Sequence, residues 1–282
     1  MKHAYLIITH SSYDILCKLI CALDDTRNDI YIHIDKKANF DGTTLRTEKS
    51  KLVILSNRLD ARWGDYSLVK VELMLFEEAH NNGPYGYYHL ISGVDFPLKS
   101  QDFIHNFCDK YQGTEFIGFA KTTQNEIRWR SQHYFPFSRF FKSKNILIRF
   151  IRSSIARFQS IINYSRSSLV IKKGCQWCSI TDELVKYILD NKKLIHQIFN
   201  HTYCPDEMFV QTLCWNSKFR DRIYDINDEF NGCKRFIVWN NGVLKMLDDV
   251  SPDILFSSDK LFGRKFSDKG INIINSRYKQ II

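Results

Sequence analysis

Three carboxylates stand where they could bind a ligand or move a proton. Glu207 follows a proline in the segment Tyr203-Cys204-Pro205-Asp206-Glu207, while Asp35 and Asp95 end apolar runs that are typical of β-strands. A carboxylate held beside a substrate hydroxyl can act as a general base. Each also has a structural interpretation: Glu207 can complement a helix dipole, and an aspartate at a strand end can cap a helix or close an Asx turn. The residues alone leave both interpretations open.

Two lysines near the C-terminus could neutralise a bound phosphate. Lys245 and the Lys265 of Phe262-Gly263-Arg264-Lys265-Phe266 lie among apolar residues. A cation binds phosphate as a point charge and offsets the charge that develops on a departing diphosphate. Ordinary solvated surface lysines are the alternative.

Several familiar nucleotide-binding and metal-binding motifs are missing. The sequence has neither G-x-G-x-x-G nor G-x-x-x-x-G-K, so dinucleotide redox chemistry and ATP hydrolysis lose their main support. It also has no Asp-x-Asp triplet, with which many sugar-nucleotide transferases hold a divalent metal. We therefore expect no metal and no cofactor.

Eight cysteines show no regular spacing, which favours a reduced compartment over a disulfide framework. Cys175-Gln176-Trp177-Cys178 lacks the second pair that a zinc site of this kind requires. Cys17 and Cys21 lie four apart in an apolar helical pattern and are predicted to be core residues.

The predicted elements alternate in the manner of an α/β protein. Apolar runs predict strands at residues 3–9, 29–35, 51–56, 87–92, 115–119, 177–180 and 235–239. Helical spacing predicts helices at residues 12–24, 66–81, 182–191 and 208–215, with Thr181 as an N-cap. This order indicates a doubly wound, Rossmann-like, mostly parallel sheet flanked by helices, whose ligand crevice lies at the carboxyl ends of its strands. No repeat or linker divides the chain, so we expect one domain over residues 1–282.

The net charge of +9 is concentrated in one stretch. Residues 127–181 contain no Asp or Glu and eleven basic residues: Arg128, Arg130, Arg139, Lys142, Lys144, Arg149, Arg152, Arg157, Arg166, Lys172 and Lys173. Such a stretch should face something anionic. Residues 145–158 interleave apolar and cationic side chains as helices on anionic membranes do. A solvated basic helix packed on the domain is the alternative.

A nucleic-acid-binding protein is a further alternative from another functional class. It would use the basic stretch with its aromatic residues Phe140, Phe141, Phe150 and Phe158. This interpretation leaves the strand-end carboxylates and the C-terminal cations unexplained, so we expect no nucleic-acid partner.

Eight segments, taken together, resemble the core-2 and I-branching β-1,6-N-acetylglucosaminyltransferases and the related peptide O-xylosyltransferases, a family with many bacterial members. They occur in the family's order and leave out the basic insertion at about 138–173. They are residues 4–10, 32–35, 62–64, 88–98, 174–177, 204–207, 235–239 and 261–266. The run Tyr88-His89-Leu90-Ile91-Ser92-Gly93-Val94-Asp95-Phe96-Pro97-Leu98 is the most specific.

The resemblance implies a GT-A type fold and an inverting transfer from a UDP-sugar without a metal. In the family, the glutamate that matches Glu207 is the general base, and the carboxylate that matches Asp35 contacts the nucleoside. Lys265 matches one of two cations that hold the diphosphate. Lys245 fits the second by spacing, although the animal enzymes have arginine there. His10 and Trp63 lie in matched segments and are assigned to the same donor site.

The acceptor side is assigned to Asp95, Trp177, Arg128, Arg130 and Tyr134. Trp177 is either a wall for a sugar ring or a plain core tryptophan. GlcNAc is the first choice of sugar, with xylose and galactose as alternatives. The expected acceptor is a hydroxyl of a glycan or a lipid-linked glycan, in the synthesis of a bacterial surface polysaccharide. The N-terminal apolar run suits a first strand better than a signal peptide, so we expect a cytoplasmic enzyme with peripheral contact to the inner face of the membrane.

Overall fold

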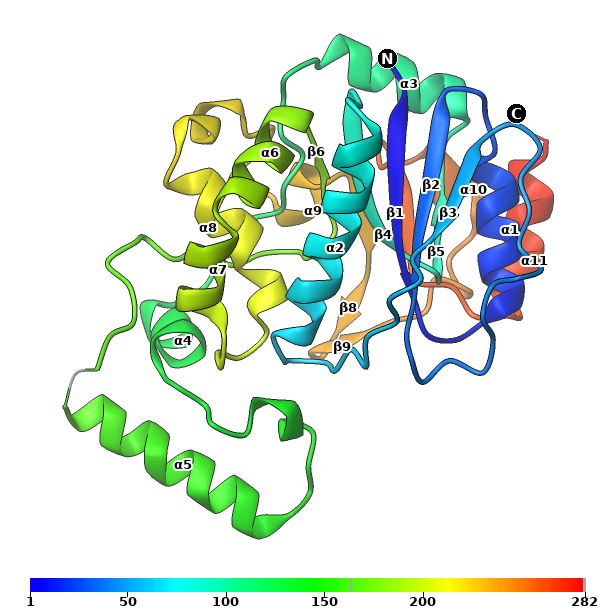
Figure 1. The fold of residues 1–282 in the computed structure, drawn as a ribbon. Coiled ribbons are helices and arrows are strands. Elements are labelled where there is room, and N and C mark those ends of the chain that lie inside the picture. Colours follow the sequence, from blue (N-terminus) through cyan, green and yellow to red (C-terminus); the bar gives the residue numbers. More distant parts are fainter. Residues whose placement is uncertain (163, 281–282) are drawn as a thin grey trace.

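Four parallel strands form the centre of the computed structural model, which describes residues 1–162 and 164–280 (Figure 1). They are β1 (His3–Thr9), β2 (Asn28–Ile34), β3 (Lys51–Ile54) and β4 (Tyr87–Ser92), in the order β3-β2-β1-β4. The short β6 (Ser179–Ile180) adds an antiparallel edge beside β4. The predicted α/β fold, with a mostly parallel sheet flanked by helices, is confirmed.

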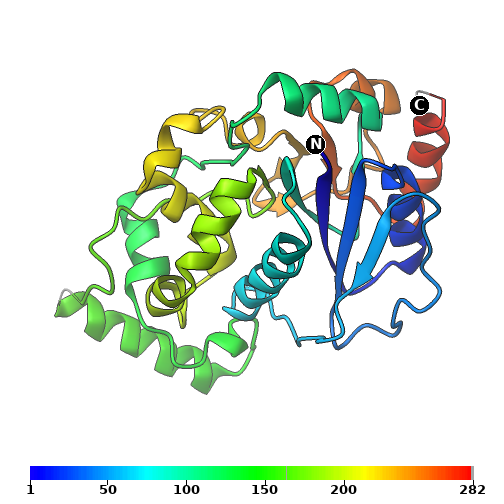
Figure 2. The ribbon, with the colours of Figure 1, turned by 45° about the horizontal axis from the view of Figure 1, so that its top comes forward.

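Both faces of this sheet are covered, which explains why its central strands are continuous apolar runs. Successive residues of β1 point to opposite sides, so that Leu6 joins one core and Ile7 the other. On one side lie α2 (Ser67–Asn82), α6 (Asp182–Asp190), α7 (Lys192–Phe199) and α8 (Phe209–Trp215). On the other lie α1 (Tyr13–Leu23), α3 (Gln101–Lys110) and α11 (Gly270–Tyr278), as Figure 2 shows.

A second, smaller sheet joins distant parts of the chain. β10 (Phe262–Arg264) pairs antiparallel with β5 (Asp95–Pro97) and parallel with β7 (Arg235–Ile237). The predicted strand 235–239 is interrupted at Val238, after which β8 (Trp239–Asn240) forms a hairpin with β9 (Val243–Leu244). This sheet places Arg264 opposite Asp95.

Two sequence-based expectations are wrong. The strand predicted at 115–119 is reduced to isolated bridges at Glu115 and Phe116, because the chain then passes between loops, with Gly118 close to Gly174 and Glu229. Cys21 is exposed, since it lies on the outer side of α1, whereas Cys17 is partly buried against the core. All eight cysteines are free thiols.

Other predicted features are confirmed. The Thr181 hydroxyl accepts a hydrogen bond from the Leu184 amide and caps α6. The basic stretch contains α5 (Ile146–Ile161), whose first turn is capped by Asn145. Among the described residues, no helix combines the length and apolar character that crossing a membrane requires.

Residues 124–161 form a layer at one end of the molecule, at the lower left of Figure 1. Before α5 this layer contains α4 (Gln124–Ile127), the π-helical turn η1 (Arg128–Gln132) and the 3-10 turn η2 (Ser138–Phe140). The remaining short elements are η3 (Pro205–Glu207), η4 (Lys218–Arg222), α9 (Glu229–Gly232) and α10 (Pro252–Ser257).

Candidate active site

A cavity of about 970 Å³ opens near the carboxyl end of β4. Trp177 lines it just before the antiparallel β6, and Arg264 lines it at the end of β10. In the strand order β3-β2-β1-β4 the connections change direction between β1 and β4, and ligand crevices of such sheets lie at the carboxyl ends beside this point. The cavity is therefore where the fold would hold a ligand.

The backbone around Glu207 is fixed by three distant segments. Glu207 ends the turn η3, which Cys204 enters with a left-handed backbone (φ 50°, ψ 56°). The Cys204 amide donates to the Gly64 carbonyl (3.1 Å), and the Gly174 amide donates to the Glu207 carbonyl (2.9 Å). The Tyr203 amide donates to the Arg130 backbone carbonyl (2.9 Å). These bonds present the Glu207 side chain to the cavity, of which it is a lining residue.

The Glu207 carboxylate is held by an ion pair. Its Oε2 accepts a hydrogen bond from Arg130 Nη1 at 2.8 Å. Its other oxygen, Oε1, accepts none from residues 1–162 or 164–280. Arg130 is in turn paired with Glu126 (3.1 Å), which also contacts Lys173 (3.2 Å). The base candidate thus lies at the end of a chain of alternating charges, with one oxygen left for a substrate proton.

Two buried carboxyls lie behind this ion pair. Asp206 is buried and its Oδ1 has no hydrogen-bond partner in the described chain. Burial and the neighbouring Glu207 carboxylate raise the pKa of Asp206 to about 8. Burial likewise raises the pKa of Glu72, whose Oε1 accepts a hydrogen bond from Gln176. Both shifts favour the protonated form of the buried carboxyl, and of the two residues only Asp206 lines the cavity beside Glu207.

Arg264 and Asp95 form a second ion pair, 2.6 Å long. Asp95 is fully buried and does not line the cavity, whereas Arg264 does and lies over the Trp177 ring at 4.2 Å. Burial raises the pKa of Asp95, and the Arg264 charge opposes this shift. Asp95, predicted to contact substrate, therefore orients Arg264 from behind.

The predicted donor-site residues are brought together only in part. Asp35 is buried at the end of β2, where its oxygens accept hydrogen bonds from the Lys37 amide (2.8 Å) and the Ala61 amide (3.0 Å). His10 and Lys245 are exposed, and Lys265 is half-buried. Of the residues predicted for the donor, Trp63 is the one found among those that line the cavity.

Aromatic side chains form much of the cavity wall. Trp63 is 47% exposed, contacts Tyr203 edge-on and lies under the Lys142 ammonium. Trp177 is nearly buried, and it is thus both a core residue and part of the wall. Such rings offer flat apolar faces to a sugar.

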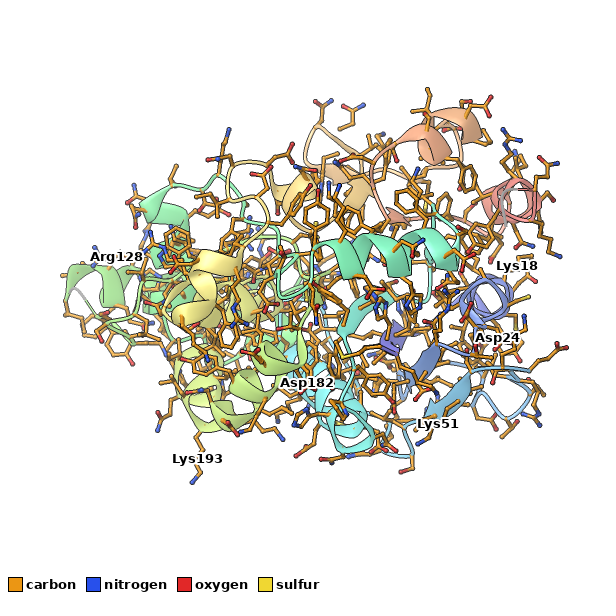
Figure 3. All side chains as sticks on the ribbon, turned by 90° about the horizontal axis from the view of Figure 1, so that it is seen from above. Lys18, Asp24, Lys51, Arg128, Asp182 and Lys193 are labelled. Atoms are coloured by element: carbon orange, nitrogen blue, oxygen red, sulfur yellow. The ribbon has the colours of Figure 1, made fainter. Side chains whose placement is uncertain are left out.

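The remaining predicted acceptor residues lie at or beyond the edge of this site. Arg130 lines the cavity, but its guanidinium is bound to Glu207. Tyr134 lies outside it and packs on His201 at 4.7 Å. Arg128 is exposed at the left-hand end of the view in Figure 3.

Several cavity residues are absent from the sequence-based prediction, among them Arg264, Lys173 and Trp239. Arg264 precedes Lys265 in the same matched segment, and Trp239 ends the segment 235–239. Lys173 comes directly before the segment 174–177. The matched segments thus indicated where in the sequence the site lies. They did not indicate which of two adjacent side chains faces the cavity.

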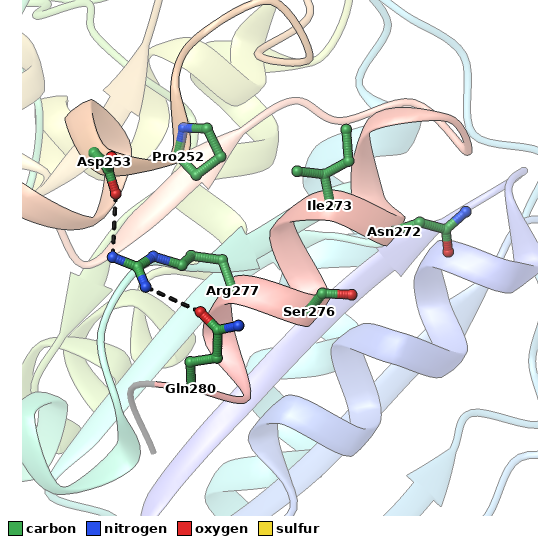
Figure 4. A pocket seen from close by; sticks show the side chains of 7 residues that line it. All are labelled: Pro252, Asp253, Asn272, Ile273, Ser276, Arg277 and Gln280. Atoms are coloured by element: carbon green, nitrogen blue, oxygen red, sulfur yellow. Dashed lines mark hydrogen bonds and ion pairs between the residues drawn. The ribbon is translucent and has the colours of Figure 1, made fainter.

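Other groupings of polar residues lie away from the cavity. His3, His89 and Cys108 are buried together, and the nitrogens His89 Nε2 and His3 Nδ1 are hydrogen-bonded at 3.1 Å. A shallow depression between α10 and α11 is shown in Figure 4, where Arg277 bonds to Asp253 (3.1 Å) and Gln280 (2.9 Å). Neither adjoins Glu207.

Known proteins resemble this chain over most of its length. Xylosyltransferase sqv-6 of Caenorhabditis briggsae is 25% identical over 211 residues, which are 68% of this chain and 23% of that protein. Xylosyltransferase 1 of Rattus norvegicus is 19% identical over 237 residues, which are 80% of this chain and 27% of that protein. The chain thus spans about a quarter of the length of these relatives.

Among solved structures, apo mouse xyloside xylosyltransferase 1 aligns with 93% of this chain and 97% of its own, at 10% identity and a TM-score of 0.38. A model of the Core-2/I-Branching enzyme family matches residues 3–251. The match includes Glu207, Arg130 and Asp95, although it ends before Arg264. The chain belongs to the Core-2/I-Branching enzyme family.

Proposed function

We propose that this protein is an inverting glycosyltransferase that moves a sugar from a UDP-sugar to an acceptor hydroxyl, with Glu207 as the general base. The observation that carries the proposal is the Glu207 carboxylate, which faces the cavity with Oε2 bound to Arg130 and Oε1 open. The family match supports the class of reaction.

Inversion requires the acceptor oxygen to attack the anomeric carbon in line with the departing diphosphate. The new C–O bond forms as the C–O bond to the diphosphate breaks, and a base takes the hydroxyl proton. Glu207 Oε1 is the oxygen for that proton. Arg130 keeps the carboxylate turned toward the reacting centre, since the other oxygen is tied to its guanidinium.

The leaving diphosphate would be neutralised by protein cations without a metal. Arg264 is supported by its ion pair with Asp95 and lines the cavity, and Lys265 follows it in the chain. Lys245, in the loop after β9, would add a further cation. Positive side chains that are already in place stabilise charge as it develops on a leaving group.

Two donor sugars are favoured by different observations. The branching enzymes of the family favour GlcNAc, whereas the relatives named xylosyltransferase favour xylose; galactose is a third candidate. We propose a glycan or lipid-linked glycan as acceptor, in bacterial surface polysaccharide synthesis on the cytoplasmic side of the membrane.

The first experiment measures protection against thermal unfolding by UDP in the presence of a chelator, followed by slow hydrolysis of a panel of UDP-sugars. We expect UDP to raise the unfolding temperature without metal, and one UDP-sugar to be hydrolysed faster than the rest. Protection by an oligonucleotide but not by UDP would instead indicate a nucleic-acid-binding protein.

The second experiment replaces the base. Glu207→Gln should retain UDP protection while transfer falls at least about a hundredfold, the scale of a lost general base. Glu229→Gln is the matched control, because Glu229 is another carboxylate that lines the same cavity. Near-normal transfer by Glu207→Gln, or an equal loss in Glu229→Gln, would refute the assignment.

A further inference from the structure

Helix α5 presents its apolar side away from the protein. Five large apolar side chains are strongly exposed on it, with exposed fractions of 61% to 81%: Ile146, Leu147, Phe150, Phe158 and Ile161. At 100° per residue they fall within one sector of the helix, which we call the α5 outer face. A helix on the surface of a globular domain normally turns such a face toward the core.

The opposite side of α5 is attached to the body by polar contacts. Gln159 is nearly buried, and its side-chain amide bonds in both directions with the Tyr134 backbone (2.7 and 3.0 Å). Ser160 Oγ bonds to His133 Nε2 (3.0 Å), and Arg152 lies over the Phe141 ring at 5.1 Å. These specific contacts fix the orientation of the helix, so the exposure of the outer face is built into the fold.

Positive charges lie beside and within the outer face. By the same helical spacing Arg149 lies at its edge, whereas Arg157 falls between Ile146 and Phe150, from where its long side chain can extend to a polar boundary. Lys144, Arg149 and Arg157 form no ion pair with any residue in 1–162 or 164–280. The stretch of residues 127–181 has no acidic side chain that could satisfy them. An apolar face bordered by unpaired cations matches a surface that is apolar inside and anionic at its edge.

We propose that α5 lies on a bilayer containing anionic lipids, with the outer face among the acyl chains and its flanking cations at the headgroups. A helix of 16 residues is about 24 Å long, which suits an interfacial helix. A second copy of the chain fits less well, because two such faces would bring arginines together without acidic partners. A nucleic acid would leave the apolar side chains in water.

The position of α5 links this surface to the active site. The segment before α5 packs on Tyr203 through Phe141 (ring centroids 4.6 Å apart) and Trp129 (5.1 Å). Tyr203 directly precedes the turn that carries Glu207. Membrane contact would therefore hold the cavity close to the surface from which a lipid-linked acceptor extends. This last step rests on the proposed function, whereas the lipid contact itself does not.

The test is co-sedimentation of the full chain with vesicles of phosphatidylcholine alone or with about one anionic phosphatidylglycerol in three lipids. We expect binding to the anionic vesicles that weakens with added salt, and little binding to the neutral ones. Phe150→Ser with Ile161→Ser should lower partitioning at least about tenfold, since each side chain loses acyl-chain contact. Arg149→Gln with Arg157→Gln should lower it about fivefold per arginine.

Ile254→Ser with Ile273→Ser is the matched control, because these isoleucines on α10 and α11 are 57% and 59% exposed at the other end of the molecule (Figure 1). This control variant should bind vesicles as strongly as the parent chain does. All variants should keep the circular dichroism spectrum of the parent chain and its protection by UDP against thermal unfolding. No binding to anionic vesicles at low salt, or full binding by Phe150→Ser with Ile161→Ser, would overturn the proposal. So would self-association of the parent chain that this variant abolishes, since a second copy would then cover the face. If UDP failed to protect the parent chain against thermal unfolding, this result would count against the proposed function and not against the lipid contact.

Discussion

Arg130 and Glu207 lie 77 residues apart in the sequence and form an ion pair of 2.8 Å at the cavity. The pair leaves one Glu207 oxygen open, and Arg130 also lies over the Tyr203 ring at 5.2 Å. Arg130 was predicted to contact the acceptor, but in the structure its guanidinium binds the base candidate. Its expected role is to position Glu207.

Replacing Arg130 should therefore affect turnover more than donor binding. In Arg130→Gln we expect kcat to fall about ten- to a hundredfold, because the freed carboxylate no longer holds one orientation. The KM for the UDP-sugar should stay within about threefold. Arg130→Lys should recover part of kcat, since lysine keeps the positive charge but lacks the planar guanidinium group with its several N–H donors. Arg220→Gln, which removes an arginine stacked on Trp215, is the control. A change confined to KM would contradict the positioning role.

The cation that faces the diphosphate can be identified by comparing neighbours. Arg264→Gln should weaken UDP binding by about ten- to a hundredfold, the worth of a hydrogen bond to a charged group. Lys265→Gln and Lys245→Gln should each weaken it less, because neither side chain lines the cavity in the described chain. Isothermal titration with UDP measures all three.

Arg264→Gln also leaves Asp95 buried without its partner, so Arg264→Gln with Asp95→Asn is the appropriate companion variant. It should restore stability without restoring UDP affinity. If Arg264→Gln and its companion variant both bound UDP with normal affinity while Lys265→Gln lost much of its affinity, the lysines and not Arg264 would be assigned to the diphosphate.

Gly174 supports Glu207 through the backbone. A Cβ atom at Gly174 would lie 1.8 Å from the Gly118 carbonyl oxygen, and the Gly174 amide donates to the Glu207 carbonyl. Gly174→Ala should therefore lower the free energy of unfolding by about 1–3 kcal/mol or more and reduce transfer as well. Urea unfolding and an activity assay measure the two effects.

Gly113→Ala is the control for Gly174→Ala. Nothing lies within 4 Å of its added Cβ, so only its positive φ of 82° is unfavourable. A cost of about 1–2 kcal/mol with unchanged transfer is expected. Equal loss of transfer in both variants would contradict the close approach at Gly174.

Asp206 should make the protein less stable as pH rises. The folded chain keeps its proton up to about pH 8, whereas the unfolded chain releases it near 3.8. Between these values the unfolded state binds fewer protons, so the free energy of unfolding falls with pH, by at most about 1.4 kcal/mol per unit from this group. In Asp206→Asn the fall should be shallower, as urea unfolding across this pH window would show. An unchanged slope, equal to that of the exposed control Asp268→Asn, would contradict the assignment.

The local features of this chain follow from its sequence. Strands β1 and β4 form at the predicted residues because long apolar runs mark strands that are covered on both faces. Thr181 caps α6 because its hydroxyl can reach an amide in the first turn. The motif order also indicated the family, since the segment with Glu207 and the run 88–98 are both present.

Tertiary structure decided which side chains meet. Arg264 is the last residue of β10 and Lys265 follows the strand, and only the pairing of β10 with β5 puts Arg264 beside Asp95. The ion pair of Arg130 with Glu207 depends on packing between segments far apart in the chain. The amphipathic spacing of α5 was visible in the sequence, but which side faces outward was set by its polar contacts with Tyr134 and His133. Spacing fixes which residues share a face, whereas the direction of that face depends on what the rest of the chain places beside it.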